Sequence, residues 1–578
     1  GQGAIINNSP RSQMQTFGRI TMAGNTTFGG ASRFDIRNNT PTLTMNGYTL
    51  TKISTNFINA TAINVTPDGE GGTGAIDVQG GTFSLDNAVK FNGSSANTLT
   101  VRNGAIMQLY NVATNNPLLW SLTLEQNASL YPGAGAGLGA VNVWSGPVTL
   151  NGAALLAGTG NSVTFSGPIG GSGSLIKTAG ASTFYLTGTN TYSGTTAVSN
   201  GTLYAKTVGS LPGVGTSRVT VTSGGTLLVP TGDGVTTGWT YDQLRALLYD
   251  TDTFNTNTAT LGIDTSLASL DHTGDLTKHM ALLKLGPNTL TLSGVNTFRG
   301  ALTVNGGVLD VAGAANHAVG SVTIGNASMM LTNTTPQYFS IVSNSTAIVG
   351  NGAADFGRLT LAGNAAWSSY LQGYNSGASV LYVGYNGRGV LLVQDNATLT
   401  NRLILGYAAG SHGAIYQRGN SVVHNWGGSS SDTRLGVSGY GYYELSSGTL
   451  TNNGYTQMAQ GLTGIGILAQ FGGILRQGSV YGGDLSISRG GTGVVYLAGG
   501  TFASSVGMTV GAISDNGGSR GFADLTMAGS ASAMLSGVIN MADRTNIFAV
   551  VNLNGGTLTA NQFSKSNRTG SLALVNFN

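Results

Sequence analysis

Apolar side chains recur at every second position in short stretches of this chain, and glycine-rich steps separate the stretches. A period of two is typical of β-strands. From residue 381 onward the pattern itself repeats about every 26 residues, and positions two and four after each strand opening are mostly apolar. The openings are Gly389, Gly413, Gly441, Gly466, Gly493, Gly521, Ala549 and Gly570.

A unit of this size with two or three short strands cannot bury its apolar face alone. It must stack on similar neighbours, as the coils of a solenoid do. Turns such as Ala498-Gly499-Gly500-Thr501 supply the corners, because glycine adopts positive φ without steric cost. We therefore predict an all-β fold, a parallel β-solenoid in which equivalent strands of successive coils pair about 4.8 Å apart.

The same succession of corner and strand occurs towards the N-terminus, for example at Gly80-Gly81-Thr82-Phe83. We expect a first solenoid part over residues 1–230 and a second over 281–578. Residues 231–280 interrupt the pattern, and within them 239–250 have helical spacing of apolar side chains after a candidate N-cap. We predict one short helix there, in an excursion that packs against the side of the solenoid. The N-cap is Thr240, and the spaced side chains are Tyr241, Leu244, Leu247 and Leu248.

Two segments, Lys177–Leu203 and Lys284–Leu309, share a motif at a constant offset of 106 residues. Each contains Asn-Thr, an aromatic residue and a glycine two positions later, at 190–194 and 296–300. Both resemble the autotransporter-associated β-strand repeat of secreted bacterial proteins. The resemblance implies a right-handed parallel β-helix that is exported by a bacterium and lies outside the cell or on its surface.

Composition excludes several classes of protein. Glycine numbers 92, charged residues make up 8% where about 25% is usual, and cysteine is absent. A disulfide scaffold, a thiolate zinc site and a highly charged disordered tail are therefore excluded. The net charge of +3 comes without any basic run, so we expect no nucleic-acid partner. No apolar stretch is long enough for a transmembrane segment.

Candidate catalytic chemistry is sparse. A β-helical glycosidase needs two carboxylates close together, and the chain has three glutamates, Glu70, Glu125 and Glu444. The densest acidic segment contains Asp250 and Asp252, and its spacing fits no calcium-binding motif. We expect no enzyme activity, no cofactor and no metal, and a polysaccharide-active enzyme is the third hypothesis for function.

Aromatic residues crowd one region of the second solenoid part. Such side chains bind sugars or a partner protein when few charges surround them, or they stack in ladders inside or along the solenoid. The candidate binding patch consists of Trp367, Tyr370, Tyr374, Tyr382 and Tyr385. An adhesin, or a passenger that binds glycans or a host surface, is the second hypothesis.

The two ends carry apolar strand residues where a polar cap is expected. They are Ile5 and Ile6 near the N-terminus and Leu572, Leu574 and Phe577 near the C-terminus. An uncapped end invites head-to-tail pairing with another copy, which does not close and produces a fibre. A weakly charged surface also repels its own copies little. The leading hypothesis is an extracellular structural protein that self-associates, head-to-tail or laterally, into a filament, sheath or surface layer.

Overall fold

The computed structural model of the chain forms two compact units, Gly1–Leu267 (unit 1) and Ala268–Asn578 (unit 2). It describes all residues except a set of short segments. These segments are 1–3, 38–40, 62–63, 67–73, 87–93, 111–116, 134–140, 251–252, 314–315, 342–344, 369–378, 426–432, 479–482, 513–520 and 544.

Unit 1 is built from parallel strands that pair with the equivalent strand of the next coil, in four sheets. Sheet 1A contains β1 (Ile5–Asn7), β4 (Thr26–Gly30), β7 (Thr49–Lys52), β10 (Ala75–Val78), β12 (Thr98–Val101), β14 (Ser121–Leu124), β17 (Val148–Leu150) and β20 (Ile169–Gly171). Sheet 1B contains β2 (Gln13–Phe17), β5 (Phe34–Ile36), β8 (Phe57–Thr61), β11 (Thr82–Asp86), β13 (Ile106–Tyr110), β15 (Ser129–Pro132), β18 (Ala154–Ala157), β21 (Leu175–Ala179), β23 (Thr196–Val198) and β25 (Val219–Val221). Sheet 1C contains β3 (Arg19–Thr21), β6 (Thr42–Thr44) and β9 (Asn64–Thr66). Sheet 1D contains β16 (Val141–Trp144), β19 (Ser162–Phe165), β22 (Thr183–Leu186), β24 (Gly201–Ala205), β26 (Gly225–Pro230) and β27 (Thr260–Asp264).

Unit 2 has three sheets, and most of its coils contribute one strand to each. Sheet 2A contains β29 (Ala281–Leu285), β31 (Ala301–Val304), β34 (Ser321–Ile324), β37 (Thr346–Val349), β40 (Val380–Val383), β43 (Arg402–Leu405), β46 (Thr433–Leu435), β49 (Thr456–Met458), β52 (Leu485–Ile487), β55 (Met508–Val510), β58 (Val538–Met541) and β61 (Gln562–Lys565). Sheet 2B contains β28 (Leu270–His272), β30 (Thr289–Leu292), β32 (Val308–Val311), β35 (Ser328–Leu331), β38 (Phe356–Leu361), β41 (Arg388–Val393), β44 (His412–Gln417), β47 (Tyr440–Leu445), β50 (Ile465–Gln470), β53 (Thr492–Leu497), β56 (Gly521–Met527), β59 (Ile547–Leu553) and β62 (Leu572–Phe577). Sheet 2C contains β33 (Asn316–Val319), β36 (Gln337–Ile341), β39 (Ala365–Ser368), β42 (Thr398–Thr400), β45 (Val422–Asn425), β48 (Thr449–Asn452), β51 (Ile474–Gln477), β54 (Thr501–Ser504), β57 (Ser532–Leu535) and β60 (Thr557–Thr559).

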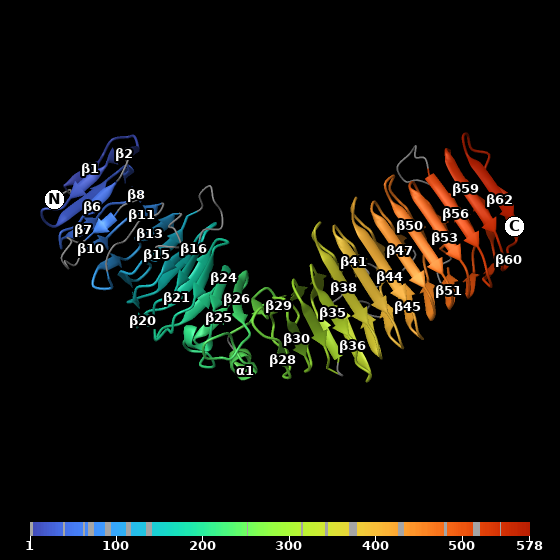
Figure 1. Cartoon of the computed structure of the whole chain (residues 1–578), viewed down its shortest axis with the longest axis horizontal. Coiled ribbons are helices and arrows are strands. Elements are labelled where there is room, and N and C mark those ends of the chain that lie inside the picture. Colours follow the sequence, from blue (N-terminus) through green and yellow to red (C-terminus); the bar gives the residue numbers. More distant parts are fainter. Residues whose placement is uncertain are drawn as a thin grey trace. The chain divides into compact units, whose positions relative to one another are not determined.

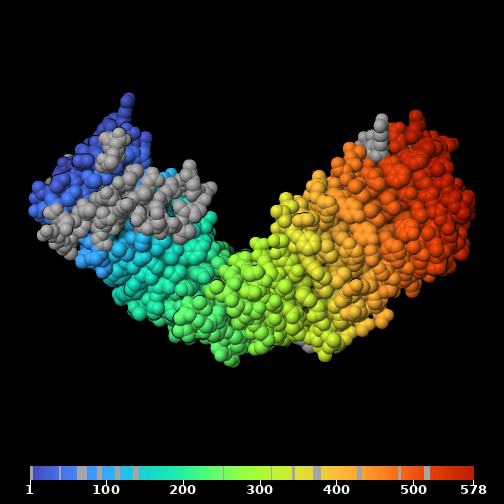
Figure 2. Space-filling view, in the orientation of Figure 1, coloured from blue at the N-terminus to red at the C-terminus, as the bar shows by residue number. Residues whose placement is uncertain are grey.

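The predicted parallel β-solenoid is confirmed. Within unit 2 the strands lie side by side in chain order (Figure 1), and the coils follow one another as bands of changing colour in the space-filling view (Figure 2). Inward side chains form continuous apolar rows from coil to coil. One row in sheet 2B is at most 2% exposed, and it consists of Leu391, Ile415, Tyr443, Leu468, Val495, Leu525 and Val551.

A left-handed corner follows the strand of sheet 2A in successive coils of unit 2. The residue just after the strand has positive φ in eight coils: Gly350, Gly384, Gly406, Gly436, Ala459, Ser488, Gly511 and Ala542. The next strand opens against this corner. At Gly413 a Cβ would lie 1.9 Å from the carbonyl oxygen of Val383 and 2.7 Å from the backbone nitrogen of Gly406. The recurrent glycines of the sequence are therefore explained by close backbone packing at the corners.

The expected strand openings are in register for Gly389, Gly413, Gly441, Gly466, Gly493 and Ala549, which form one row. Two openings are wrong. Ala523 and not Gly521 aligns with Gly493, because β56 begins one residue earlier in register than β53. Gly521 lies two positions before Ala523, so the inward face is kept. Ala573 and not Gly570 aligns with Ala549, and this shift of three residues reverses the faces of the last strand.

The predicted helix is confirmed as α1 (Tyr241–Tyr249), with Thr240 as its N-cap in a capping box with Gln243. Its buried face consists of Leu244, Leu247 and Leu248. A 3₁₀ turn, η1 (Val208–Ser210), precedes it in unit 1. The departure from the stack is shorter than the expected 231–280, because β27 (Thr260–Asp264) already pairs with β26.

Candidate functional surfaces

The first residue of each shared sequence motif is a buried lysine. Lys284 is 0% exposed, and the three N–H groups of its Nζ are shared among four backbone carbonyls, those of Leu285, Gly286, Asn288 and Gly306, at 2.7 to 3.0 Å. Lys177 is also 0% exposed and donates to two corner carbonyls at 2.8 and 3.0 Å. These carbonyls lie at the ends of β21 and β29 and in the turns beside them, and the ammonium group gives these buried acceptors a donor.

Lys52 repeats this arrangement in unit 1, outside the two recognised motifs. Its Nζ donates to the carbonyls of Ile53, Ser54 and Gly80 at 2.7 to 2.8 Å. Burial lowers the pKa of Lys52 and that of Lys177 from 10.5 to about 8. Burial raises the pKa of Tyr192 and that of Tyr204 from 10.0 to about 12.

These shifts predict how the stability of unit 1 depends on pH. Between pH 8 and about 10 the native lysines release a proton that the unfolded chain keeps, so the free energy of unfolding rises with pH. Above about pH 10 the tyrosines of the unfolded chain lose a proton that the native tyrosines keep, so the free energy of unfolding falls with pH. Urea titrations between pH 7 and 12 should show this maximum near pH 10. In the Lys52→Met/Lys177→Met variant, the free energy of unfolding should no longer rise between about pH 8 and 10 but should still fall above about pH 10. A rise that persists in this variant would contradict its assignment to these lysines.

The other motif residues are also part of the packing. Asn190 donates from Nδ2 to the carbonyl of Ser210 at 2.6 Å and accepts at Oδ1 from the backbone of Ile169 at 2.9 Å. Tyr192 is 1% exposed and its hydroxyl lies 2.6 Å from that of Thr196, while Phe298 of the second motif is 0% exposed. The shared motif is therefore a structural signature of one coil and its corner.

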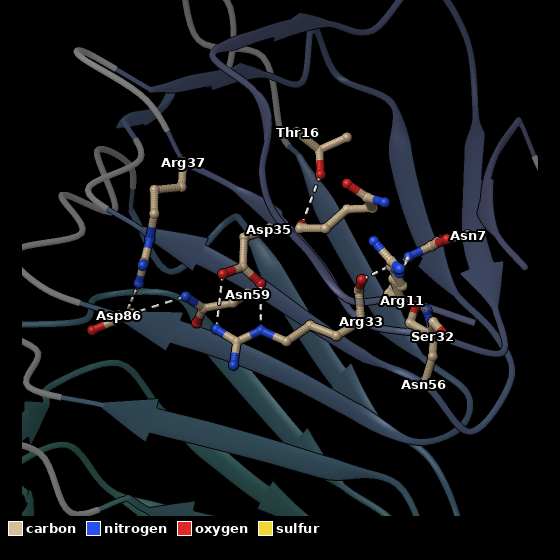
Figure 3. A network of polar contacts seen from close by, with 11 residues as sticks. Asn7, Arg11, Thr16, Ser32, Arg33, Asp35, Arg37, Asn56, Asn59 and Asp86 are labelled. Atoms are coloured by element: carbon tan, nitrogen blue, oxygen red, sulfur yellow. Dashed lines mark hydrogen bonds and ion pairs between the residues drawn. The ribbon is translucent and has the colours of Figure 1, made fainter. Parts of the chain in front are cut away.

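A partly buried polar network in unit 1 joins neighbouring coils (Figure 3). Arg33 and the fully buried Asp35 form a two-point ion pair, with N···O distances of 2.7 and 2.8 Å, and this contact raises the pKa of Arg33. Oδ2 of Asp86 accepts from Arg37 and from Asn59, each at 3.2 Å. Two carboxylates and two guanidinium groups thus balance their charges, so we interpret the network as structural. The sequence did not predict this network, because Arg37 and Asp86 are far apart in the chain and only the stacking of coils brings them together.

The candidate aromatic patch is only partly at the surface. Trp367 is 1% exposed and stacks on Phe339 inside unit 2, with ring centroids 4.7 Å apart. Tyr382 and Tyr385 lie instead on the outer side of sheet 2A, with centroids 5.0 Å apart, and Tyr385 stacks on Tyr407 at 4.9 Å. Tyr370 and Tyr374 lie outside the described residues. The surface cluster is therefore Tyr382, Tyr385 and Tyr407, and Trp367 belongs to the core.

The candidate acidic residues have local hydrogen-bond or ion-pair partners. Glu444 accepts from the hydroxyls of Tyr442 at 2.7 Å and Ser446 at 2.9 Å. Asp250 follows the last residue of α1 and its carboxylate accepts from Ser217, and Glu125 pairs with Arg102 at 2.7 Å. Glu70 and Asp252 lie outside the described residues. Among the residues that the structure describes, no group of three or more His, Asp or Glu side chains could hold a metal ion.

The outermost coil of unit 2 exposes apolar side chains. Leu572, Leu574 and Phe577 are 55%, 44% and 76% exposed, whereas Val550, the in-register neighbour of Leu574 in β59, is 7% exposed. In the outermost coil of unit 1, Ile5 and Ile6 of β1 are half-buried and pair with β4. Of the described strands, β62 pairs with β59 alone and β1 with β4 alone.

Parallel coils and glycine corners define this protein as a β-solenoid, and two of its segments carry the shared motif with a buried lysine. Residues 175–205 and 282–311 match the Passenger-associated-transport-repeat family, so the chain carries two copies of that repeat. The repeat and the fold fit an autotransporter passenger domain and indicate an extracellular or cell-surface location. No curated protein and no solved structure matches the chain. In the described ranges, no helix is both long and apolar enough to cross a membrane.

Proposed function

We propose that this passenger-type solenoid is a non-enzymatic structural protein that self-associates end to end into an extracellular filament, sheath or surface layer. The observation that carries the proposal is the exposed apolar coil of unit 2. Phe577 lies in register with Leu553, on an inward row of the solenoid, yet it is 76% exposed. A further coil stacked on β62 would bury it as the other coils bury their inward residues.

The occupant that we propose for this coil is a second copy of the chain. Within the described chain, the outer edges of β62 and β1 both present unpaired backbone N–H and C=O groups. Head-to-tail stacking of β1 on β62 keeps the parallel pairing that successive coils use within each unit. The net charge of +3 with 8% charged residues opposes such contacts only weakly. The local bonds of Glu444, Asp250 and Glu125 support a role without catalysis.

Crosslinking tests the head-to-tail geometry directly, because the chain has no cysteine. Ile5→Cys and Leu572→Cys are made singly, mixed in equal amounts and treated with a short bismaleimide crosslinker. We expect the mixed dimer as the main product, since the joint brings opposite ends together. A mixture that gives only products of identical chains, or none although both thiols react with a monofunctional maleimide, would overturn the head-to-tail arrangement.

A second candidate function is binding of glycans by the outer side of sheet 2A. It is favoured by the surface cluster of Tyr382, Tyr385 and Tyr407, whose rings pack on one another at a solenoid corner. Tyr407 is 37% exposed, so part of an aromatic face is available to solvent. Tyrosine combines an apolar ring with a polar hydroxyl group, and such side chains are common where one side of a contact is apolar and the other is exposed to water.

A further inference from the structure

The outer side of sheet 2A carries two rows of side chains that run along unit 2. The first row points outward from successive strands in register: Tyr382, Ile404, Arg434, Gln457, Ser486, Thr509 and Asn540. The second row follows each strand by two residues, just past the left-handed corner: Tyr385, Tyr407, Val437, Gln460, Arg489, Ala512 and Asp543. We call the surface between and around these rows the 2A groove.

The 2A groove contains two hollows. The larger one, of about 520 Å³, is lined by Tyr455, Gln457, Asp484, Ser486, Arg489, Thr509, Ala512 and Asp543. The smaller one, of about 390 Å³, is lined by Tyr407, Ala408, Arg434, Val437, Ser438, Gln460 and Gly461. Arg434 of the smaller hollow is in register with Gln457 of the larger one, so their linings meet on adjacent strands. Both volumes lie within the usual range for small-ligand sites.

Each hollow contains a glutamine oxygen that lacks a hydrogen-bond donor. Gln457 is only 8% exposed, and its side chain lines the larger hollow. Within the described part of the chain, neither its Oε1 nor that of Gln460 in the smaller hollow accepts a hydrogen bond. Leaving a buried amide oxygen unsatisfied is costly, so such a group calls for a bound partner that donates to it.

The remaining groups of the larger hollow match a ligand rich in hydroxyl groups. The carboxylate of Asp484 is oriented by Thr509, whose Oγ1 donates at 2.8 Å, and by Ser486, whose Oγ donates at 3.2 Å. A carboxylate accepts at two oxygens, so it can bind neighbouring hydroxyls of one sugar ring. Tyr455 is 41% exposed beside it and offers an aromatic face to the C–H side of such a ring.

Charge and shape narrow the ligand further. Asp484 and Asp543 face a single guanidinium group, that of Arg489, so the larger hollow disfavours anionic sugars. The two hollows lie on successive coils along the stack and not side by side on one coil. We propose that the 2A groove binds a neutral oligosaccharide that lies along the solenoid axis, with Gln457 and Asp484 accepting from its hydroxyls. This proposal rests on the second candidate function and is independent of end-to-end assembly.

The test measures binding of neutral hexasaccharides built from glucose, galactose or N-acetylglucosamine to the full chain by titration calorimetry, with a uronic-acid hexamer for comparison. We expect at least one neutral hexamer to bind and to bind at least tenfold more tightly than the uronate. Gln457→Leu removes the buried acceptor at similar volume, and Tyr455→Ala removes the aromatic face. Each substitution should weaken binding at least tenfold.

Two further variants keep the proposal falsifiable if Gln457→Leu does not fold. Asp543→Asn changes a charge on a corner of the groove and should relax the preference against the uronate. Tyr338→Ala is the matched control, because Tyr338 is 57% exposed in β36 of sheet 2C, away from the groove. Absence of binding to every neutral hexamer, or equal losses for Tyr338→Ala and Tyr455→Ala, would overturn the groove proposal. End-to-end crosslinking of the groove variants should be unchanged, which separates this proposal from the assembly proposal.

Discussion

Gly413→Ala is expected to destabilise unit 2 by about 3 kcal/mol or more, which is at the upper end for overpacking. The new Cβ would lie 1.9 Å from the carbonyl oxygen of Val383, which accepts a backbone hydrogen bond from Gly406 at 3.0 Å. Both contacting atoms belong to backbone, so a side-chain rotation cannot relieve the clash. Relief requires the corner to move, and the corner is stacked on equivalent corners in the neighbouring coils. Urea unfolding followed by intrinsic fluorescence measures the effect.

Gly410→Ala is the matched control for this substitution. Gly410 lies three residues earlier, in the turn before β44, and no heavy atom lies within 4 Å of its added Cβ, although its φ is +77°. Its replacement should therefore cost only the left-handed backbone strain, about 1–2 kcal/mol. Equal destabilisation by the two substitutions would contradict the assignment of the recurrent glycines to close packing at the corner.

Lys284→Met is expected to destabilise unit 2 by several kcal/mol. Methionine fills much of the same volume, but it leaves the four carbonyls that Lys284 binds without this donor. Each buried acceptor that loses its partner costs about 1–3 kcal/mol, and part of this is recovered because the ammonium no longer has to be buried. The urea midpoint of unit 2 should fall accordingly.

Lys565→Met is the control, because Lys565 is exposed in β61 of the same unit. It should change the free energy of unfolding by less than about 0.5 kcal/mol, as surface substitutions usually do. A loss in Lys284→Met no larger than that in the control would show that the motif lysine is dispensable for the fold. The recurrence of lysine in this repeat would then need another explanation.

Periodicity and glycine spacing were sufficient to predict the solenoid, the helix at 241–249 and most of the strand register. They succeeded because each coil buries the same alternating face, so the signal recurs along the chain. The predicted register is wrong at Gly570, because this glycine precedes the last strand but does not form the corner against which the strand opens. A glycine count alone cannot distinguish these two cases, since both place glycine before an alternating strand.

Surface positions were harder to predict, because stacking combines residues that are far apart in the sequence. The sequence places Trp367 in a candidate aromatic patch and leaves open whether it binds a partner or stacks inside the solenoid; its strand position turns it inward onto Phe339. The 2A groove is assembled from residues 20 to 30 positions apart, and it becomes visible only after strand register and corners are known. One signal was available in the sequence, the polar residues at outward positions of the strands that precede each corner.

The most direct test of the proposed structural role is negative-stain electron microscopy of the purified chain over a range of concentrations, beside the variant Leu574→Glu/Phe577→Glu. We predict linear polymers that lengthen with concentration for the unmodified chain, because its apolar coil is covered by the next copy. The variant should remain as single solenoids, since carboxylates at the joint cannot be buried unpaired. Single particles of the unmodified chain at every concentration, or polymers that both chains form equally, would contradict end-to-end assembly.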